Sequence, residues 1–252
     1  MRHMEIKTNK RWIGVITASG ILLGALVLAV GIFSPAIQAN GPAHFQVFDR
    51  DSVVYGRTYG DWEAAWNQWA DSIPTGNHPL FDNGDISVGQ TGPVWFLGGK
   101  FCALYTNCAT TGVVRSGNVP AGTALFVDVF NTEDSVLEDP GKQINDLRAA
   151  SESFLDPATV SMEVDGQPIY DLKSKFRVQS PAFVFTLPDD NFFTAVGEGP
   201  FKGGSYFPAV DDGVYVMLAP LPPGHHTIHF QGAITTPFTF ALDVTYHLNV
   251  QH

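Results

Sequence analysis

Aromatic residues recur at helical spacing between Thr58 and Ser72. Residues three and four apart lie on one face of a helix. The residues on this face are Tyr59, Trp62, Trp66, Trp69 and Ile73. Thr58 with Asp61 three residues later forms a capping box, and Pro74 ends the pattern. We therefore predict a helix whose tryptophans either anchor it to a sheet or stack on sugar rings.

A second helix is expected from about Pro140 to Phe154. Asp139 can cap it and Pro140 suits its first turn, where a backbone N–H is not needed. Asp156-Pro157 should stop it.

Most of the remaining chain alternates between apolar and polar residues or forms short apolar runs, as strands do. The expected strands are Phe45–Phe48, Val94–Leu97, Ala124–Phe130, Thr159–Val164, Pro168–Leu172, Ala182–Leu187, Val214–Leu218, His226–Phe230 and Phe238–Val250. Asp165-Gly166 is a hairpin signal between two of them. No strand–helix–strand rhythm of about 30 residues occurs, which argues against a parallel doubly wound sheet. The predicted fold is mainly β: an antiparallel β-sandwich, jelly-roll or immunoglobulin-like, with two helices, one of them Trp-rich, packed on it.

The first 39 residues have the three parts of a secretory signal. Residues 1–12 are basic, residues 13–33 carry no charge, and small residues precede a cleavage site after Ala39. The uncharged run is also long enough to span a bilayer if it is not cleaved. We expect residues 1–39 to be a signal peptide or an N-terminal membrane anchor. Residues 40–252 would then form a single β-rich domain that is periplasmic or secreted.

The charge balance narrows the class of partner. Residues 1–39 hold four of the 14 basic and one of the 25 acidic residues, which leaves ten basic and 24 acidic residues and a net charge of −14. This argues against nucleic acid and anionic membrane surfaces, because both need basic patches. A membrane would be contacted only through residues 13–33, if they are retained. The acidic pairs Asp189-Asp190 and Asp211-Asp212 are expected to be solvated loop residues.

The two cysteines, Cys102 and Cys108, both lie in the part expected to be exported. An oxidising compartment favours a disulfide that closes this small loop. A thiolate metal site is the alternative, but no Cys-x-x-Cys spacing supports it.

The last two expected strands carry histidines on a polar face. Alternation places Asp243 and His247 on one side of the final strand, and His229 joins them if the two strands form a hairpin with aligned apolar faces. Imidazole and carboxylate are common ligands of zinc and copper, and histidine titrates near neutral pH. His229, His247 and Asp243 are therefore candidate metal ligands or acid–base groups. The alternative is a solvated row in which His229 bonds Asp243.

The segment from Asn77 to Asp85 gathers oxygen-bearing side chains around a glycine. Calcium prefers such ligands. The spacing is not that of an EF-hand loop, and Asp-Asn-Gly is ordinary turn chemistry. A calcium site and a plain turn both remain open for this segment.

Short motifs are spread over residues 59–248. They are Tyr59-Gly60-x-Trp62, Trp66-x-Gln68-Trp69, Gly89-Gln90-x-Gly92-Pro93-Val94-Trp95-Phe96-Leu97, Val119-Pro120-Ala121-Gly122, His226-Thr227-Ile228-His229-Phe230 and Asp243-Val244-Thr245-Tyr246-His247-Leu248. This pattern resembles a family of exported bacterial proteins without an assigned function. The resemblance implies export and a single fold over almost all of residues 40–252, and it transfers no activity. Packing explains the glutamines of these motifs less well, so Gln68 and Gln90, with His78, are candidate ligand-binding residues.

Three functions fit the sequence. The leading hypothesis is an exported protein that binds a carbohydrate, a small molecule or another envelope or extracellular ligand. The second is a metal-assisted extracytoplasmic enzyme that uses the late histidines and Asp243 with a divalent metal such as calcium, zinc or copper. The third is an envelope protein that self-assembles into homo-oligomers through its sheet edges. The sequence contains none of the common nucleophile, zinc, phosphate or dinucleotide motifs, which weighs against the enzyme hypothesis without excluding it.

We predict that the exported form begins at Asn40. The intact mass of protein from the exported fraction should match residues 40–252, less two hydrogens for a disulfide between Cys102 and Cys108. A mass for the full chain would instead identify residues 13–33 as a retained anchor.

Overall fold

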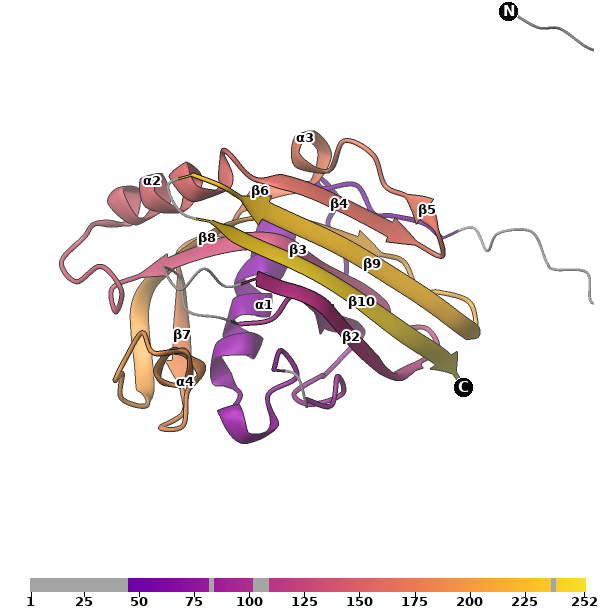
Figure 1. Cartoon of the computed structure of the whole chain (residues 1–252), viewed down its shortest axis with the longest axis horizontal. Helices are drawn as coiled ribbons and strands as arrows, with labels where there is room; N and C mark the ends of the chain where they lie inside the picture. Colours follow the sequence, from indigo (N-terminus) through magenta and orange to yellow (C-terminus); the bar gives the residue numbers. More distant parts are fainter. Residues whose placement is uncertain (1–44, 82–83, 102–108, 237–238) are drawn as a thin grey trace, which may run out of the picture. The chain divides into compact units, whose positions relative to one another are not determined.

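The computed structural model describes residues 45–81, 84–101, 109–236 and 239–252. The predicted leader and the predicted disulfide between Cys102 and Cys108 lie outside these residues. The described chain is mainly β, with two five-stranded sheets (Figure 1). No helix of this part of the chain is long and apolar enough to cross a membrane.

The first sheet has the order β1–β3–β8–β6, and β7 also pairs with β8. Its strands are β1 (Val94–Leu97), β3 (Ala124–Ser135), β6 (Arg177–Gln179), β7 (Phe183–Leu187) and β8 (Gly204–Leu218). The second sheet has the order β2–β10–β9–β4–β5. Its strands are β2 (Ala109–Pro120), β4 (Thr159–Val164), β5 (Gln167–Pro168), β9 (Gly224–Ile234) and β10 (Phe240–Gln251). The helices are α1 (Tyr59–Ser72), α2 (Ile144–Leu155), α3 (Leu172–Phe176), α4 (Phe192–Val196) and the 3-10 turn η1 (Thr75–Asn77).

Both sheets are mixed, which corrects the prediction of purely antiparallel pairing. β1 pairs with β3 in parallel, and β2 pairs with β10 in parallel. The reason is the route of the chain: between β1 and β3 it forms β2 in the other sheet. It therefore returns to the first sheet running in the same direction as it left. β2 was not expected, because its apolar residues do not alternate cleanly.

The inner faces of the two sheets share one core. The ring of Phe130 in β3 lies edge-on to Phe240 in β10, with centroids 5.5 Å apart. Gly232 of β9 sits so close to this ring that a Cβ atom would come within 2.2 Å of it. The absence of a side chain at Gly232 thus lets the second sheet approach β3.

Helix α1 packs on the first sheet through its tryptophan face. Trp62, Trp66 and Trp69 are each less than 8% exposed. Their indole N–H groups donate to the carbonyl oxygens of Val54, Leu97 and Val88, at 2.8, 3.0 and 3.2 Å. A buried, hydrogen-bonded indole anchors a helix and cannot stack on a ligand.

Several element boundaries differ from the expected ones. Helix α2 begins later than predicted, because Gln143 rather than Asp139 forms a capping box, with Asp146. The expected strand 168–172 ends after Pro168 and turns through Asp171, in the left-handed conformation, into α3. The segment 45–48 contributes only an isolated bridge, Val47 to Leu218.

We predict that Trp66→Ala lowers the free energy of unfolding by about 3–5 kcal/mol, because it removes a large buried side chain from the centre of the α1 interface. Trp66→Phe should cost less, since it keeps an aromatic ring and loses mainly the hydrogen bond to Leu97. Denaturant unfolding of both variants measures the difference. Equal stability of Trp66→Ala and the parent would contradict the anchoring role.

Candidate functional site

The outer face of the second sheet carries the polar row predicted from alternation. In β9 and β10 the apolar side chains, such as Phe230 and Val244, are buried, and the residues between them face outward. The register pairs His229 with Thr245 and His247 with Thr227. His229, Asp243 and His247 therefore share one face, as expected. We call this surface the polar face.

Only two of these three side chains meet. His229 Nε2 lies 2.9 Å from Asp243 Oδ1, and its Nδ1 lies 3.6 Å from Glu163 Oε1. Gln231 donates to the other oxygen of Asp243 at 3.0 Å. His247 instead contacts the Thr227 hydroxyl at 3.4 Å, because residues four apart on a strand are about 13 Å apart. Within the described ranges, no three His, Cys, Asp or Glu side chains are placed to hold a metal ion.

A shallow groove of about 490 Å³ lies at the end of the polar face where β2, β9 and β10 run side by side (Figure 1). Its lining residues are Ser116, Gly117, Asn118, His225, His226, Thr227, His247, Leu248 and Asn249. The side chains of His226 and Leu248 are buried, so these two residues border the groove mainly through their backbone. Asn249 donates to the side-chain oxygen of Asn118 at 3.0 Å. The lining contains no Asp, Glu, Lys or Arg, in a protein of net charge −11. The groove thus offers hydroxyls, amides and imidazoles, and no carboxylate, ammonium or guanidinium group.

The predicted ligand-binding glutamines lie elsewhere. Gln68 donates to the carbonyl oxygen of Val184 at 2.8 Å, which joins α1 to β7. Gln90 uses both ends of its amide on the main chain: it accepts from the Phe96 N–H and donates to the carbonyl oxygens of Ile86 and Phe96. These contacts give both residues structural partners outside the groove.

His78 is buried and has a defined tautomer. Its Nδ1 accepts from the Leu80 N–H at 3.1 Å, so its Nε2 carries the proton and donates to the Ala70 carbonyl oxygen at 2.8 Å. Burial lowers the pKa of His78 to about 4, so the ring is neutral at neutral pH. In the same segment Asp85 caps the Ser87 N–H at 2.9 Å, which is turn chemistry, while Asp82 and Asn83 lie outside the described residues.

A second polar cluster, not predicted from the sequence, lies between α1 and the first sheet. We call it the acid layer. It consists of Glu63, Asn67 and Asp71 from α1, Asp128, Asn131 and Glu133 from β3, and Asp211 and Tyr215 from β8. Its α1 members are spaced four apart, so they form a polar stripe beside the tryptophans. That spacing is the sequence signal that could have revealed the acid layer.

Asp211 is the centre of the acid layer. Its carboxylate accepts from the Tyr215 hydroxyl at 2.6 Å, from Asn67 at 2.9 Å and from Asn131 at 3.2 Å. Its neighbour Asp212 is likewise 1% exposed. The expectation that Asp211-Asp212 is a solvated loop pair is therefore wrong, whereas Asp189-Asp190 is exposed as expected. Both buried acids have partners that compensate for lost hydration.

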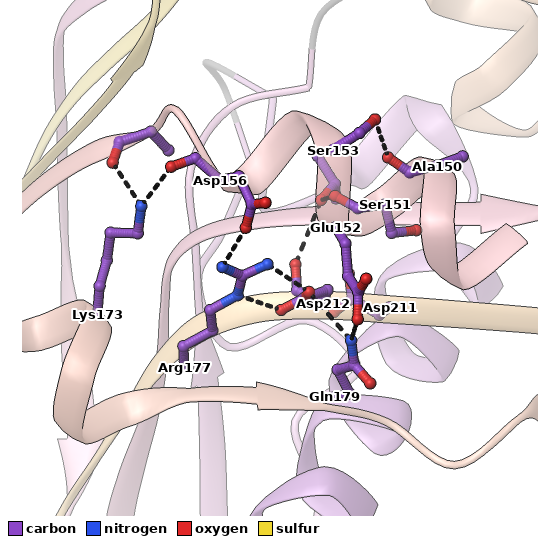
Figure 2. Close-up of polar contacts among 12 residues, drawn as sticks. Ala150, Ser151, Glu152, Ser153, Asp156, Lys173, Arg177, Gln179, Asp211 and Asp212 are labelled. Atoms are coloured by element: carbon purple, nitrogen blue, oxygen red, sulfur yellow. Dashed lines mark hydrogen bonds and ion pairs between the residues drawn. The ribbon is translucent and has the colours of Figure 1, made fainter.

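Asp212 is held on the other side of β8 by Arg177 (Figure 2). The guanidinium binds both carboxylate oxygens, with Nε 2.9 Å from Oδ1 and Nη2 2.7 Å from Oδ2. Its remaining nitrogen donates to Asp156 at 2.7 Å, and Gln179 donates to Asp212 at 3.3 Å. This fork ties β6 and the end of α2 to β8. A shallow groove beside it is lined by residues that include Arg50, Lys173 and Gln179.

No family model and no curated protein matches the chain. Among solved structures, a cysteine protease inhibitor from Entamoeba histolytica is similar at 11% sequence identity and a TM-score of 0.22. The similarity covers 63% of this chain and 96% of that one. At this level the similarity carries no argument about function.

We predict that Arg177→Gln lowers the free energy of unfolding by about 3–5 kcal/mol, because it leaves Asp212 buried without a cation. Lys175→Gln is the matched control: Lys175 pairs with Asp171 at the surface, where the two side chains are 56% and 65% exposed. Such a pair contributes about 0–1 kcal/mol. Denaturant unfolding compares the two variants, and equal small losses would show that the fork is not needed to hold Asp212.

Proposed function

We propose that residues 40–252 form an exported β-sandwich, of jelly-roll or immunoglobulin-like kind, that binds a neutral carbohydrate in the groove on the polar face. The observation that carries this proposal is the chemistry of the groove lining. The motif resemblance to exported bacterial proteins supports the extracytoplasmic location and the proposed family.

The lining of hydroxyls and amides favours a ligand with many hydroxyl groups. Amides such as those of Asn118 and Asn249 both donate and accept hydrogen bonds, and so do hydroxyls. A sugar presents alternating donors and acceptors, which such a lining can satisfy. An anionic ligand would instead favour Lys or Arg, and neither lines the groove.

The same lining predicts weak binding. No Trp, Tyr or Phe lines the groove, so it lacks the aromatic platform that supplies apolar contact area. The groove is also shallow, and exposed hydrogen bonds exchange with water for a small net gain. We expect dissociation constants of about 0.1–1 mM, or about −4 to −5.5 kcal/mol.

The metal-assisted enzyme is less well supported by the geometry. His229 and Asp243 form a pair, but His247 does not join them, and the described residues supply no third ligand. Stoichiometric zinc or copper in protein purified without chelator or affinity metal would favour that alternative. Concentration-dependent elution in size-exclusion chromatography would favour self-assembly.

We predict that neutral oligosaccharides, such as glucose- and N-acetylglucosamine-based series, perturb the NMR signals of β2, β9 and β10. His247→Ala and Asn118→Ala should each weaken binding by about tenfold, which corresponds to about 1.4 kcal/mol for lost hydrogen bonds. Gln231→Ala, on the same face but outside the groove, is the matched control and should leave binding unchanged. The proposal fails if no neutral oligosaccharide binds at millimolar concentration, or if the groove variants bind as the parent does.

A further inference from the structure

The acid layer contains more carboxyl groups than its donors can neutralise. Asp211 takes all three of the hydrogen bonds from Tyr215, Asn67 and Asn131. Glu63 is 0% exposed, and neither of its carboxyl oxygens has a donor among the described residues. It lies beside Asp211, close enough for a hydrogen bond between the two carboxyl groups if one of them is protonated.

A hydrogen bond between two carboxyl groups requires one proton, because carboxylates only accept. The three donors identify Asp211 as the ionised partner, so Glu63 carries the proton and donates it. Burial raises the pKa of Glu63 well above its ordinary value, and the charge of Asp211 raises it further. Burial likewise raises the pKa of Asp128, which also lies near Asp211.

A second pair repeats the arrangement toward the end of α1. Glu133 of β3 and Glu138 are likewise close enough for a hydrogen bond if one of them is protonated, and Asp71 of α1 lies beside them. Burial raises the pKa of Glu138 to about 7, and burial raises the pKa values of Glu133 and Asp71 well above their ordinary values. Two proton-sharing pairs thus lie under one helix.

The charged groups around Glu63 come from every element packed on this part of α1. β8 supplies Asp211, Asp212 and Tyr215, and β3 supplies Asp128. The cation of β6, Arg177, is bound to Asp212 on the opposite side of β8. Arg115 of β2 donates to the Gly98 carbonyl oxygen and the Tyr246 hydroxyl. β7 contributes no titratable side chain. The dominant influences on Glu63 are therefore burial and other acids.

We propose that the acid layer is a pH-sensitive latch: shared protons hold α1 on the first sheet, and their loss releases the helix and its tryptophan face. In the closed state Glu63 keeps its proton above its ordinary pKa of 4.5. In the open state water restores the ordinary pKa, so opening releases the proton. The stabilisation is fully present below about pH 4.5 and is lost as pH rises toward the raised pKa.

The coupling between proton release and opening sets how strongly the opening constant of α1 depends on pH. Between the two pKa values, each proton released makes the opening constant of α1 rise about tenfold per pH unit. Glu63→Gln should remove one such proton, because the amide donates to Asp211 as the protonated acid did and does not titrate. The slope of the logarithm of the opening constant against pH should therefore fall by about one.

Hydrogen exchange of full-length protein between about pH 5 and 8, corrected for the intrinsic pH dependence of exchange, measures these opening constants for α1 and for β9. We expect the opening constants of α1 amides to rise with pH, and those of β9 amides to change less. Glu152→Gln, an exposed glutamate of α2, is the matched control and should keep the parental slope.

Four results would overturn the latch. The first is an opening constant of α1 that does not change with pH in the parent protein. This test does not depend on whether a variant folds. The second is identical opening of α1 and β9, which would mean global unfolding. The third is a Glu63→Gln variant in which the logarithm of the α1 opening constant has the same slope against pH as in the parent. The fourth is hydrogen exchange of α1 that stays slow at about pH 8 only when millimolar calcium is added. The acids would then bind a cation rather than protons.

Discussion

The position of α1 depends on one buried carboxylate, that of Asp211. Removing an ionised group from water is costly unless hydrogen bonds replace its hydration. Asp211 obtains them from Asn67, Asn131 and Tyr215, so α1, β3 and β8 must keep one register to supply all three. Trp66, next to Asn67 in the helix, fixes the other side of α1 by its hydrogen bond to Leu97. Polar and apolar contacts thus specify the same docked position.

Strand β8 extends this constraint to both faces of the first sheet. Neighbouring residues of a strand point to opposite faces, so Asp211 faces α1 while Asp212 faces the side covered by α2. Arg177 binds Asp212, and Thr132 of β3 donates to the Ser151 carbonyl oxygen of α2 at 2.9 Å. Two adjacent acids in one strand therefore organise the packing on each side of it. Their burial follows from these partners rather than from their own hydropathy.

Local patterns predicted the elements whose residues follow a single period. The aromatic spacing and the Thr58 capping box gave α1 its bounds, and strict alternation gave β9, β10 and the face shared by His229 and His247. The acid layer was missed because acidic residues are seldom fully buried, although Glu63, Asn67 and Asp71 follow helical spacing. The parallel pairs could not be predicted locally, since they depend on which sheet each strand joins. The groove requires β2 to pair with β10, and this pairing joins segments that are far apart in the sequence.

The groove and the acid layer lie on opposite sides of the core, yet buried contacts connect them. On β10, His247 lines the groove while its neighbour Tyr246 points inward, and the Tyr246 hydroxyl donates to the Gly98 carbonyl oxygen at 2.8 Å. The preceding carbonyl, of Leu97, accepts the indole N–H of Trp66. A continuous chain of contacts is not by itself coupling, which requires an element with two states that both sites bias. In this domain α1 is the element that the proposed latch gives two states, so an effect of the latch on the groove would pass through Trp66 and the Leu97–Gly98 backbone.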